Sequence, residues 1–191
     1  MLQGMDDVTD LTGKLLIAMP DIGDPRFDRS VILMCAHGED GGVGLIVNKP
    51  SPEIVLSDLF EQLSIARGVP LEARVHVGGP MEGSRGFVLH PAAYRQDDST
   101  LDVAGVFGMT ATLDILRALA AGTGPDLSLV ALGYAGWGPG QLESEIAANG
   151  WLVAEATPDL VFDRDHSGKW GRAVRSLGAD PVLLSAGGGR A

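Results

Sequence analysis

The stretch SVILMCAHGEDGGVGLIVN, residues 30–48, decides the fold of this chain. It contains two apolar runs, 30–37 and 43–48, and each predicts a short buried strand. Between them lies EDGG at 39–42, which contains Asp-Gly, a dipeptide that favours the tight turn of a β-hairpin. We therefore expect the core to be built on antiparallel strands that are neighbours in the sequence.

The rest of the chain adds more strands and a few helices. Apolar runs predict strands at 14–19, 73–77, 85–90, 103–110, 127–134 and 151–156. Helices are predicted at 56–63 with Ser57 as N-cap, and at 112–122, 139–148 and 169–178. Because hairpins dominate the first half and strands do not alternate regularly with helices, we expect an α+β fold. One domain should span 11–180, with flexible termini at 1–10 and 181–191.

Composition and charge exclude several classes of protein. A chain of 191 residues with 45% hydrophobic and 20% charged residues is typical of one globular domain. Its net charge of −11 disfavours direct binding to nucleic acids or to anionic membranes. The single cysteine, Cys35, rules out an internal disulfide and favours a reducing compartment. No signal peptide and no apolar run of spanning length is visible, so we expect a cytoplasmic protein.

The glycine-rich segment GYAGWGPGQLESEI, residues 133–146, allows three interpretations. It can be a stiff corner that starts a helix, with Pro139 at the first helical position and Trp137 packed as a wedge. It can hold a small polar or aromatic ligand against Tyr134 and Trp137. It can bind phosphate through free backbone N–H groups, although Glu143 and Glu145 oppose an anion there. We favour the structural corner.

Two sets of residues around the hairpin are candidates for a catalytic or ligand-binding site. Cys35 and His37 lie two apart in a predicted strand, so we expect both side chains on one face, where an imidazole can activate a thiol. The alternative is a buried cysteine and a histidine at a strand end. Ser30 and Asn48 flank the hairpin, where they can add polar groups to a site or satisfy turn backbone.

Other motifs are weaker. Arg85 and His90 bracket a strand and can bind an anionic group or be solvated strand ends. The four scattered histidines, without HExxH or CxxC, predict no metal site, and the missing glycine-rich nucleotide motifs predict no cofactor. In the last helix, Lys169, Arg172 and Arg175 are predicted opposite the apolar face, with Arg164 nearby. This pattern indicates a solvated helix face or a docking face for an acidic partner.

Several long segments, taken in order, resemble the YqgE/AlgH family of bacterial proteins. The matching segments are 15–50, 77–90 and 132–152, and more weakly 162–178. The resemblance implies an α+β fold whose branching, hairpin-rich sheets curl into a barrel-like core with flanking helices. The residues that fall on the family's motifs are Ser30, Cys35, His37, Asn48, Gly79, Pro80, Gly86, His90, Gly133, Tyr134, Trp137, Gln141 and Glu143.

The resemblance implies much less about activity. Members are often labelled transcriptional regulators, without an established DNA-binding motif or catalytic mechanism. We expect a cytoplasmic regulatory or binding protein that acts through a protein or small-molecule partner. A thiol-dependent enzyme or redox sensor using Cys35 with His37 is the second hypothesis, and a direct DNA-binding regulator is the third. The candidate ligand-binding residues are Ser30, Asn48, Arg85, His90, Tyr134, Trp137 and Gln141.

Overall fold

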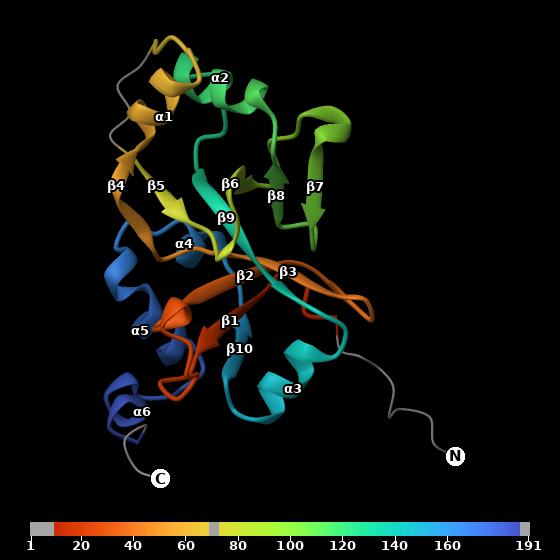
Figure 1. The fold of residues 1–191 in the computed structure, drawn as a ribbon, viewed down its shortest axis with the longest axis vertical. Helices are drawn as coiled ribbons and strands as arrows, with labels where there is room; N and C mark the ends of the chain where they lie inside the picture. Colours follow the sequence, from red (N-terminus) through yellow and green to blue (C-terminus); the bar gives the residue numbers. More distant parts are fainter. Residues whose placement is uncertain (1–9, 69–72, 188–191) are drawn as a thin grey trace.

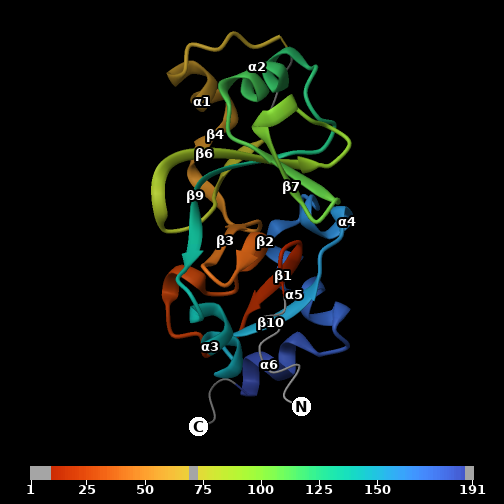
Figure 2. The same cartoon turned by 90° about the vertical axis from the view of Figure 1, so that its right-hand side faces the viewer.

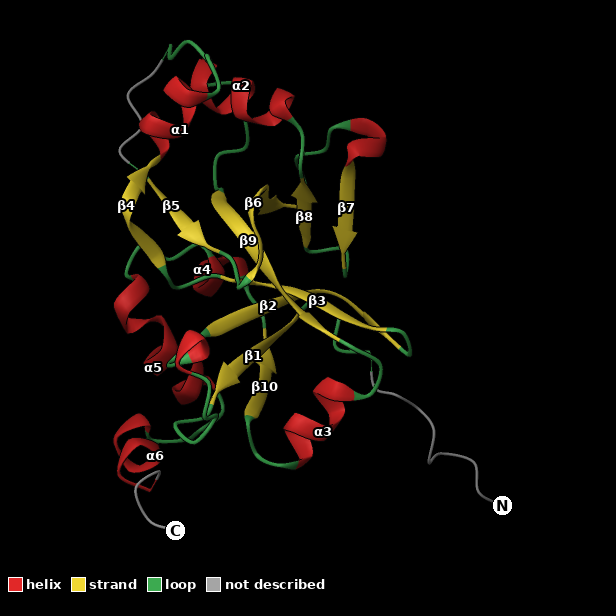
Figure 3. Ribbon diagram, viewed as in Figure 1, coloured by secondary structure: helices red, strands yellow, loops and turns green. Residues whose placement is uncertain are grey.

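The computed structural model describes residues 10–68 and 73–187. The strands are β1 (Lys14–Ala18), β2 (Val31–Gly38), β3 (Gly41–Ile46), β4 (Pro50–Val55), β5 (Arg74–Val77), β6 (Met81–Pro91), β7 (Thr100–Val103), β8 (Phe107–Thr110), β9 (Leu129–Trp137) and β10 (Trp151–Glu155). The helices are η1 (Pro25–Phe27), α1 (Leu56–Gln62), η2 (Asp97–Ser99), α2 (Leu113–Ala121), α3 (Gln141–Ala147), α4 (Pro158–Val161), α5 (His166–Ser176) and α6 (Pro181–Gly187). Figure 3 shows how they are distributed.

The strands form one curled and branched sheet (Figure 1). Its main path runs β10-β1-β2-β3-β9-β6-β8-β7, and neighbours on this path are antiparallel. A branch leaves β9 through the parallel strand β5, which pairs in turn with β4. The predicted hairpin at 30–48 is present as β2 and β3. The expectation of an α+β fold with a branched, barrel-like sheet is confirmed.

Strand β9 is the branch point of the sheet. Its last residues, Ala135–Trp137, pair with β3, whereas its first part pairs with β5 and β6. Between the two parts, Gly133 adopts a left-handed φ of 79°, and a Cβ there would lie 2.5 Å from the carbonyl oxygen of Gly79. Only glycine fits this bend and close approach, because other residues strain at positive φ. Gly133 of the GYAGW segment therefore serves the branching of the sheet.

Helices cover the sheet in three places (Figures 1 and 2). Helices α1 and α2 pack on the upper strands around Phe60 and Val130. Helix α3 covers the lower strands through Leu142, which packs with the tryptophans of β9 and β10. The largest apolar cluster lies on the other side of β1 and β2, beneath Trp170 of α5. Among the described residues, no helix is long and apolar enough to cross a membrane.

Some predicted elements differ in the structure. Residues 103–110 do not form one strand, because a turn with left-handed Ala104 and Gly105 separates β7 from β8. The N-cap of α1 is Val55 rather than Ser57, and α3 begins at Gln141 after Gly140, two residues beyond Pro139. Part of the predicted flexible C-terminus, Pro181–Gly187, forms α6. Residues 1–9 and 188–191 lie outside the described residues, so the domain limits and flexible ends stay predictions.

Candidate functional site

The glycine-rich corner fastens α3 to the sheet. One carboxylate oxygen of Glu145 accepts hydrogen bonds from the indole N–H groups of Trp137, at 3.2 Å, and Trp151, at 3.1 Å. Gln141 accepts from the backbone N–H of Gly138 at 2.9 Å and so closes the turn before α3. These contacts support the interpretation of a structural corner, in which buried indole N–H groups need acceptors.

Tyr134 and Trp137 do not form one aromatic surface. Tyr134 packs edge-on against Phe87, with ring centroids 6.1 Å apart. Trp137 belongs to the apolar cluster beneath α3 and packs against Trp151 at 5.9 Å. Residues three apart in a strand point to opposite faces, and these two do so here. The ligand site expected between them is therefore not present in this form.

His37 is tied to α3 and to the start of the chain. Its Nδ1 atom accepts from the N–H of Leu11 at 3.1 Å, so Nε2 holds the ring proton and donates to the Glu143 carboxylate at 2.5 Å. The His37 backbone N–H also donates to Thr12 Oγ1. Both ring nitrogens are used within the fold, which leaves the neutral imidazole without a free position for base catalysis.

Cys35 lies on the other face of β2, so the predicted thiol–imidazole pair is wrong. A β-bulge between Met34 and Ala36 leaves Cys35 as the extra residue and reverses the alternation of side chains. The thiol is buried among Leu33 and other apolar residues, where its Sγ lies 3.6 Å from the Leu33 carbonyl oxygen. Burial raises the pKa of the Cys35 thiol to about 12.

Asn48 and Ser30 support the backbone next to η1. Asn48 accepts from the N–H of Val31 at 2.9 Å and donates to the carbonyl of Arg29 at 2.8 Å. Arg29 adopts a left-handed φ of 52°, a conformation that such a bond helps to hold. Ser30 is fully buried, and its hydroxyl has no hydrogen-bond partner among the described residues.

Arg85 and His90 do not converge on one anion site. Arg85 is exposed on β6, lies over the Phe87 ring at 5.2 Å and is 3.5 Å from Glu82. His90 is fully buried. Its ring lies 2.8 Å from Thr110 Oγ1 and 2.9 Å from the Pro91 carbonyl, and burial lowers its pKa. His90 is therefore a satisfied core residue.

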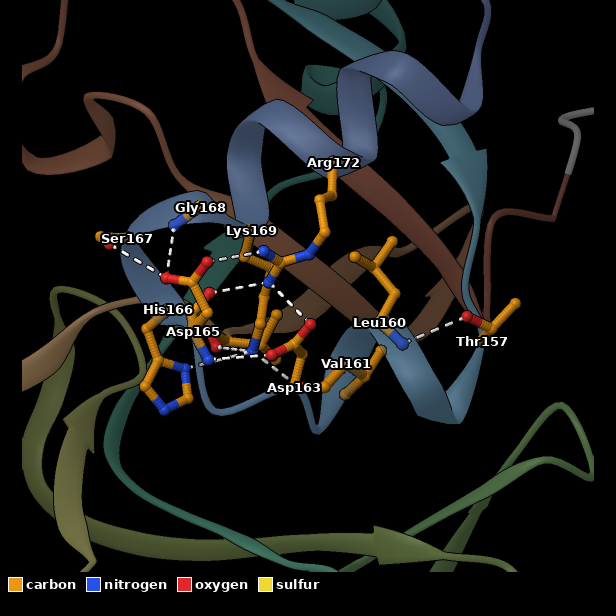
Figure 4. Close-up of polar contacts among 11 residues, drawn as sticks. Thr157, Leu160, Val161, Asp163, Asp165, His166, Ser167, Gly168, Lys169 and Arg172 are labelled. Carbon is orange, nitrogen blue, oxygen red and sulfur yellow. Dashed lines mark hydrogen bonds and ion pairs between the residues drawn. The ribbon is translucent and has the colours of Figure 1, made fainter.

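The candidate site lies instead on α5, beside a buried lysine (Figure 4). Lys169 is fully buried, and its ammonium donates to the carbonyls of Val47 at 2.8 Å and Val161 at 2.7 Å. It also lies 3.2 Å from Nδ1 of His166, which must accept because an ammonium only donates. Burial lowers the pKa of Lys169 to about 8, although the nearby Asp163 carboxylate opposes the shift.

Two histidines extend this cluster. The rings of His76 and His166 meet edge-to-face with centroids 4.5 Å apart. Burial, with a smaller effect of His166 and Lys169, lowers the pKa of His76 to about 3, and burial also lowers the pKa of His166. His76 Nδ1 is buried without a hydrogen-bond partner in the described part of the chain. Both imidazoles are therefore neutral at pH 7, next to a buried cation.

Two carboxylates hold the Arg172 side chain near the start of α5 (Figure 4). Its guanidinium pairs with Asp163 at 2.9 Å and with Asp165, the N-cap of the helix, at 2.8 Å. The Arg172 Nε–H group is buried and has no partner within residues 10–68 and 73–187. Arg172 is thus held in one orientation while one of its donors stays unused.

Arg172 lines a groove of about 560 Å³ between the residue 29 turn, α5 and α6. We call it the arginine groove, and it is lined by Arg29, Asp165, Ser167, Gly168, Trp170, Gly171, Arg172, Arg175, Pro181 and Val182. The Arg29 guanidinium stacks 4.9 Å over the Trp170 ring. Arg175 is exposed in the last turn of α5. Guanidinium groups bind carboxylates and phosphates with paired hydrogen bonds, so the groove suits an oxyanion.

The sequence-based assignment of Lys169 to the solvated face is wrong. Residues four apart share a helix face, and Lys169 precedes the buried Ala173 by four residues. That spacing was the available signal for its burial. The start of α5 at His166, three residues earlier than expected, places His166 within one turn of Lys169.

Comparisons with known proteins agree with the fold. A family model described as AlgH-like matches residues 15–182. A UPF0301 protein of Cereibacter sphaeroides is 55% identical over 183 residues, covering 95% of this chain and all of the relative. A UPF0301 protein of Ruegeria pomeroyi is 56% identical over 184 residues, with 95% and 100% covered. The solution structure of the AlgH protein from Pseudomonas aeruginosa is 39% identical, with a TM-score of 0.76 over 96% of this chain and 97% of that chain. This chain therefore belongs to the AlgH-like family.

Proposed function

We propose that this protein is a cytoplasmic regulatory or binding protein that recognises a small molecule carrying a carboxylate or phosphate group in the arginine groove. One observation carries the proposal: Arg29, Arg172 and Arg175 line the same groove of about 560 Å³ in a chain with a net charge of −11. The protein as a whole repels anions, so a local cluster of guanidinium groups stands out as a recognition feature.

The dimensions and the preorganisation of the groove support a small-molecule partner. Small-molecule sites commonly measure about 300–1,000 Å³. Arg172 is fixed by Asp163 and Asp165, and Arg29 is fixed by stacking on Trp170. Arginines that are already ordered lose little conformational entropy when a ligand binds. Gly171 also lines the groove and leaves space there, since an added Cβ would meet its nearest atoms only at 3.7 Å.

The other two hypotheses have less support. A thiol enzyme needs an accessible thiolate, whereas Cys35 is buried, has a raised pKa and lies on the opposite face from His37. A DNA-binding regulator needs many phosphate contacts, which the charge of −11 disfavours. The AlgH protein of Pseudomonas aeruginosa and this chain share a fold, and the fold alone assigns neither activity.

Isothermal titration calorimetry with pyrophosphate and with citrate tests the proposal. We expect saturable binding of at least one probe to the wild type at one site. Arg175→Gln should weaken it about tenfold, the effect of losing one charge-assisted contact. Arg117→Gln is the matched control, because Arg117 is also an exposed helix arginine but lies on α2 and pairs with Asp114. Absent binding, or equal affinity in Arg175→Gln, would overturn the proposal.

Duplex DNA is the competing ligand. The DNA-binding hypothesis predicts an affinity that falls steeply with salt, in proportion to the number of phosphates contacted. We expect no such binding at 150 mM salt. Tight, salt-dependent DNA binding that pyrophosphate does not displace would contradict a small-molecule site in the groove.

A further inference from the structure

A second pocket lies between α1, α2 and the upper strands, far from the arginine groove in the fold (Figure 1). It has a volume of about 220 Å³. Its lining residues are Leu59, Leu63, Ser84, Gly86, Phe87, Val88, Thr110, Ala111, Thr112, Leu113, Leu116, Val130 and Leu132. Two of these leucines, Leu63 and Leu113, remain 39% and 48% exposed. Apolar side chains left exposed around a hollow are typical of a binding site.

Gly86 leaves the strand side of this pocket open. It lies within β6 and pairs with Leu132 of β9, yet its φ is not positive. A Cβ at this position would meet only Leu132 Cδ2, at an ordinary distance of 3.7 Å. Neither backbone conformation nor packing within the chain requires glycine here. By contrast, a Cβ at Gly108 of β8 would lie 2.5 Å from the His90 ring.

A glycine inside a strand weakens the strand, and it often marks a place where a ligand or another backbone approaches closely. Gly86 has an apolar pocket above it rather than a neighbouring backbone. The missing side chain therefore provides room for a molecule that is not part of this chain.

The lining defines the chemistry of that molecule. No lining residue is ionisable, so a charged ligand would lose its hydration without a compensating partner. Three lining residues carry hydroxyl groups, Ser84, Thr110 and Thr112. Thr110 is hydrogen-bonded to His90 and Thr100, and the Thr112 hydroxyl is bonded to Gln96 and to the N–H of Ile115, so the exposed Ser84 supplies the polar contact. An apolar cavity of about 150 Å³ in another protein holds benzene, so a pocket of this size accepts a somewhat larger molecule.

We infer that this pocket binds an uncharged, mainly apolar small molecule, a little larger than benzene, that carries one hydroxyl or carbonyl group. Leu59 of α1, Leu63 directly after it, and Leu113 and Leu116 of α2 enclose its apolar part. The space above Gly86 admits it against β6. The exposed Ser84 hydroxyl receives its polar group. This inference is independent of the arginine groove, because the two pockets share no residue.

The probe for the test is 2-phenylethanol, followed by methyl resonances of the leucines in two-dimensional NMR. We expect saturable shifts of the pocket leucines in the wild type and at least tenfold weaker binding in Gly86→Val. Gly38→Val is the matched control, because Gly38 is also a strand glycine with open space at its Cβ but lies in β2, outside the pocket. Its affinity should equal that of the wild type.

Ala111→Leu is a second variant that narrows the pocket from the exposed segment before α2, without changing a strand. It should also weaken binding of 2-phenylethanol at least tenfold, and it keeps the inference testable if Gly86→Val does not fold. Shifts confined to leucines outside the pocket, wild-type affinity in folded Gly86→Val or Ala111→Leu, or no saturable shift would each overturn the inference.

Discussion

Helices α3 and α5 are both attached to the rest of the fold by polar side chains, half-buried glutamates in α3 and a buried lysine in α5, but they differ in their surroundings. In α3, Glu145 accepts from two indole N–H groups, and Glu143 accepts from His37. In α5, Lys169 donates to two carbonyls and lies against His166. Beyond the lysine, the same helix borders an open groove that is lined by three arginines.

The difference between α3 and α5 shows that a segment rich in glycine and aromatic residues, such as 133–146, need not be a functional site. The residues around α3 form a closed set, in which each donor or acceptor named above has its partner inside the fold. Around α5, by contrast, Arg175 is exposed and lines an open groove. An open groove lined by exposed guanidinium groups indicates a ligand more strongly than the number of glycines and aromatic residues in a motif does.

The largest effect is expected from breaking the α3 attachment. Glu145→Leu leaves the indole N–H groups of Trp137 and Trp151 without an acceptor, although both side chains are at least 94% buried. Each unsatisfied buried donor costs about 1–3 kcal/mol, so the free energy of unfolding should fall by about 3 kcal/mol in urea denaturation. Glu145→Gln keeps a carbonyl oxygen as acceptor and should lose less than half as much. A loss below about 1 kcal/mol in Glu145→Leu would refute a structural role.

The α5 attachment should give a pH-dependent effect. Lys169→Met removes the donor for the carbonyls of Val47 and Val161, and it should cost about 2 kcal/mol at pH 7. In the wild type, the pKa of Lys169 is lowered to about 8, so the unfolded chain binds more protons between about pH 8 and its ordinary value of 10.5. Wild-type stability should therefore rise with pH in this window relative to Lys169→Met. Parallel stability curves for the two proteins would contradict a buried ammonium.

His76 should make the α5 side sensitive to acid. Its pKa is lowered to about 3, whereas an unfolded histidine titrates at 6.5, so the unfolded state binds more protons between these values. Stability should fall as the pH drops below 6.5, by about 2 kcal/mol at pH 5, from 1.36 kcal/mol per pH unit. His76→Phe keeps an aromatic ring and removes this contribution. We expect its urea midpoint to decrease less than that of the wild type between pH 7 and pH 5, and an equal decrease would exclude His76 as the cause.

The smallest effect is expected at Cys35. Its thiol has a pKa of about 12 and is buried, so iodoacetamide at pH 8 should label it only as fast as the protein opens. His37→Ala should leave the pKa of the thiol unchanged, because the two side chains lie on opposite faces of β2. Rapid labelling in the native state that depends on His37 would restore the thiol-enzyme hypothesis.

The sequence was a good guide to the fold and a poor one to the site. Alternating or continuous apolar runs, such as 30–37 and 43–48, located most strands because burial imposes those patterns. The bulge at Cys35 was not predictable, because an inserted strand residue leaves no mark in composition. The arginine groove joins residue 29 with residues 165–182, which meet only through tertiary packing. The residue pattern within one segment does not indicate which distant segments will pack against it in the folded protein.

The three tryptophans allow one direct test of the difference between α3 and α5. Trp137 and Trp151 report on the α3 attachment through Glu145, and Trp170 lines the arginine groove while its indole N–H donates to the Ala18 carbonyl at 2.8 Å. A ¹H–¹⁵N spectrum recorded during a titration with pyrophosphate follows all three indole resonances at once. We predict that the Trp170 resonance shifts and saturates while the other two stay in place. Shifts of Trp137 and Trp151 with a stationary Trp170 would contradict the account and place the ligand at the α3 corner.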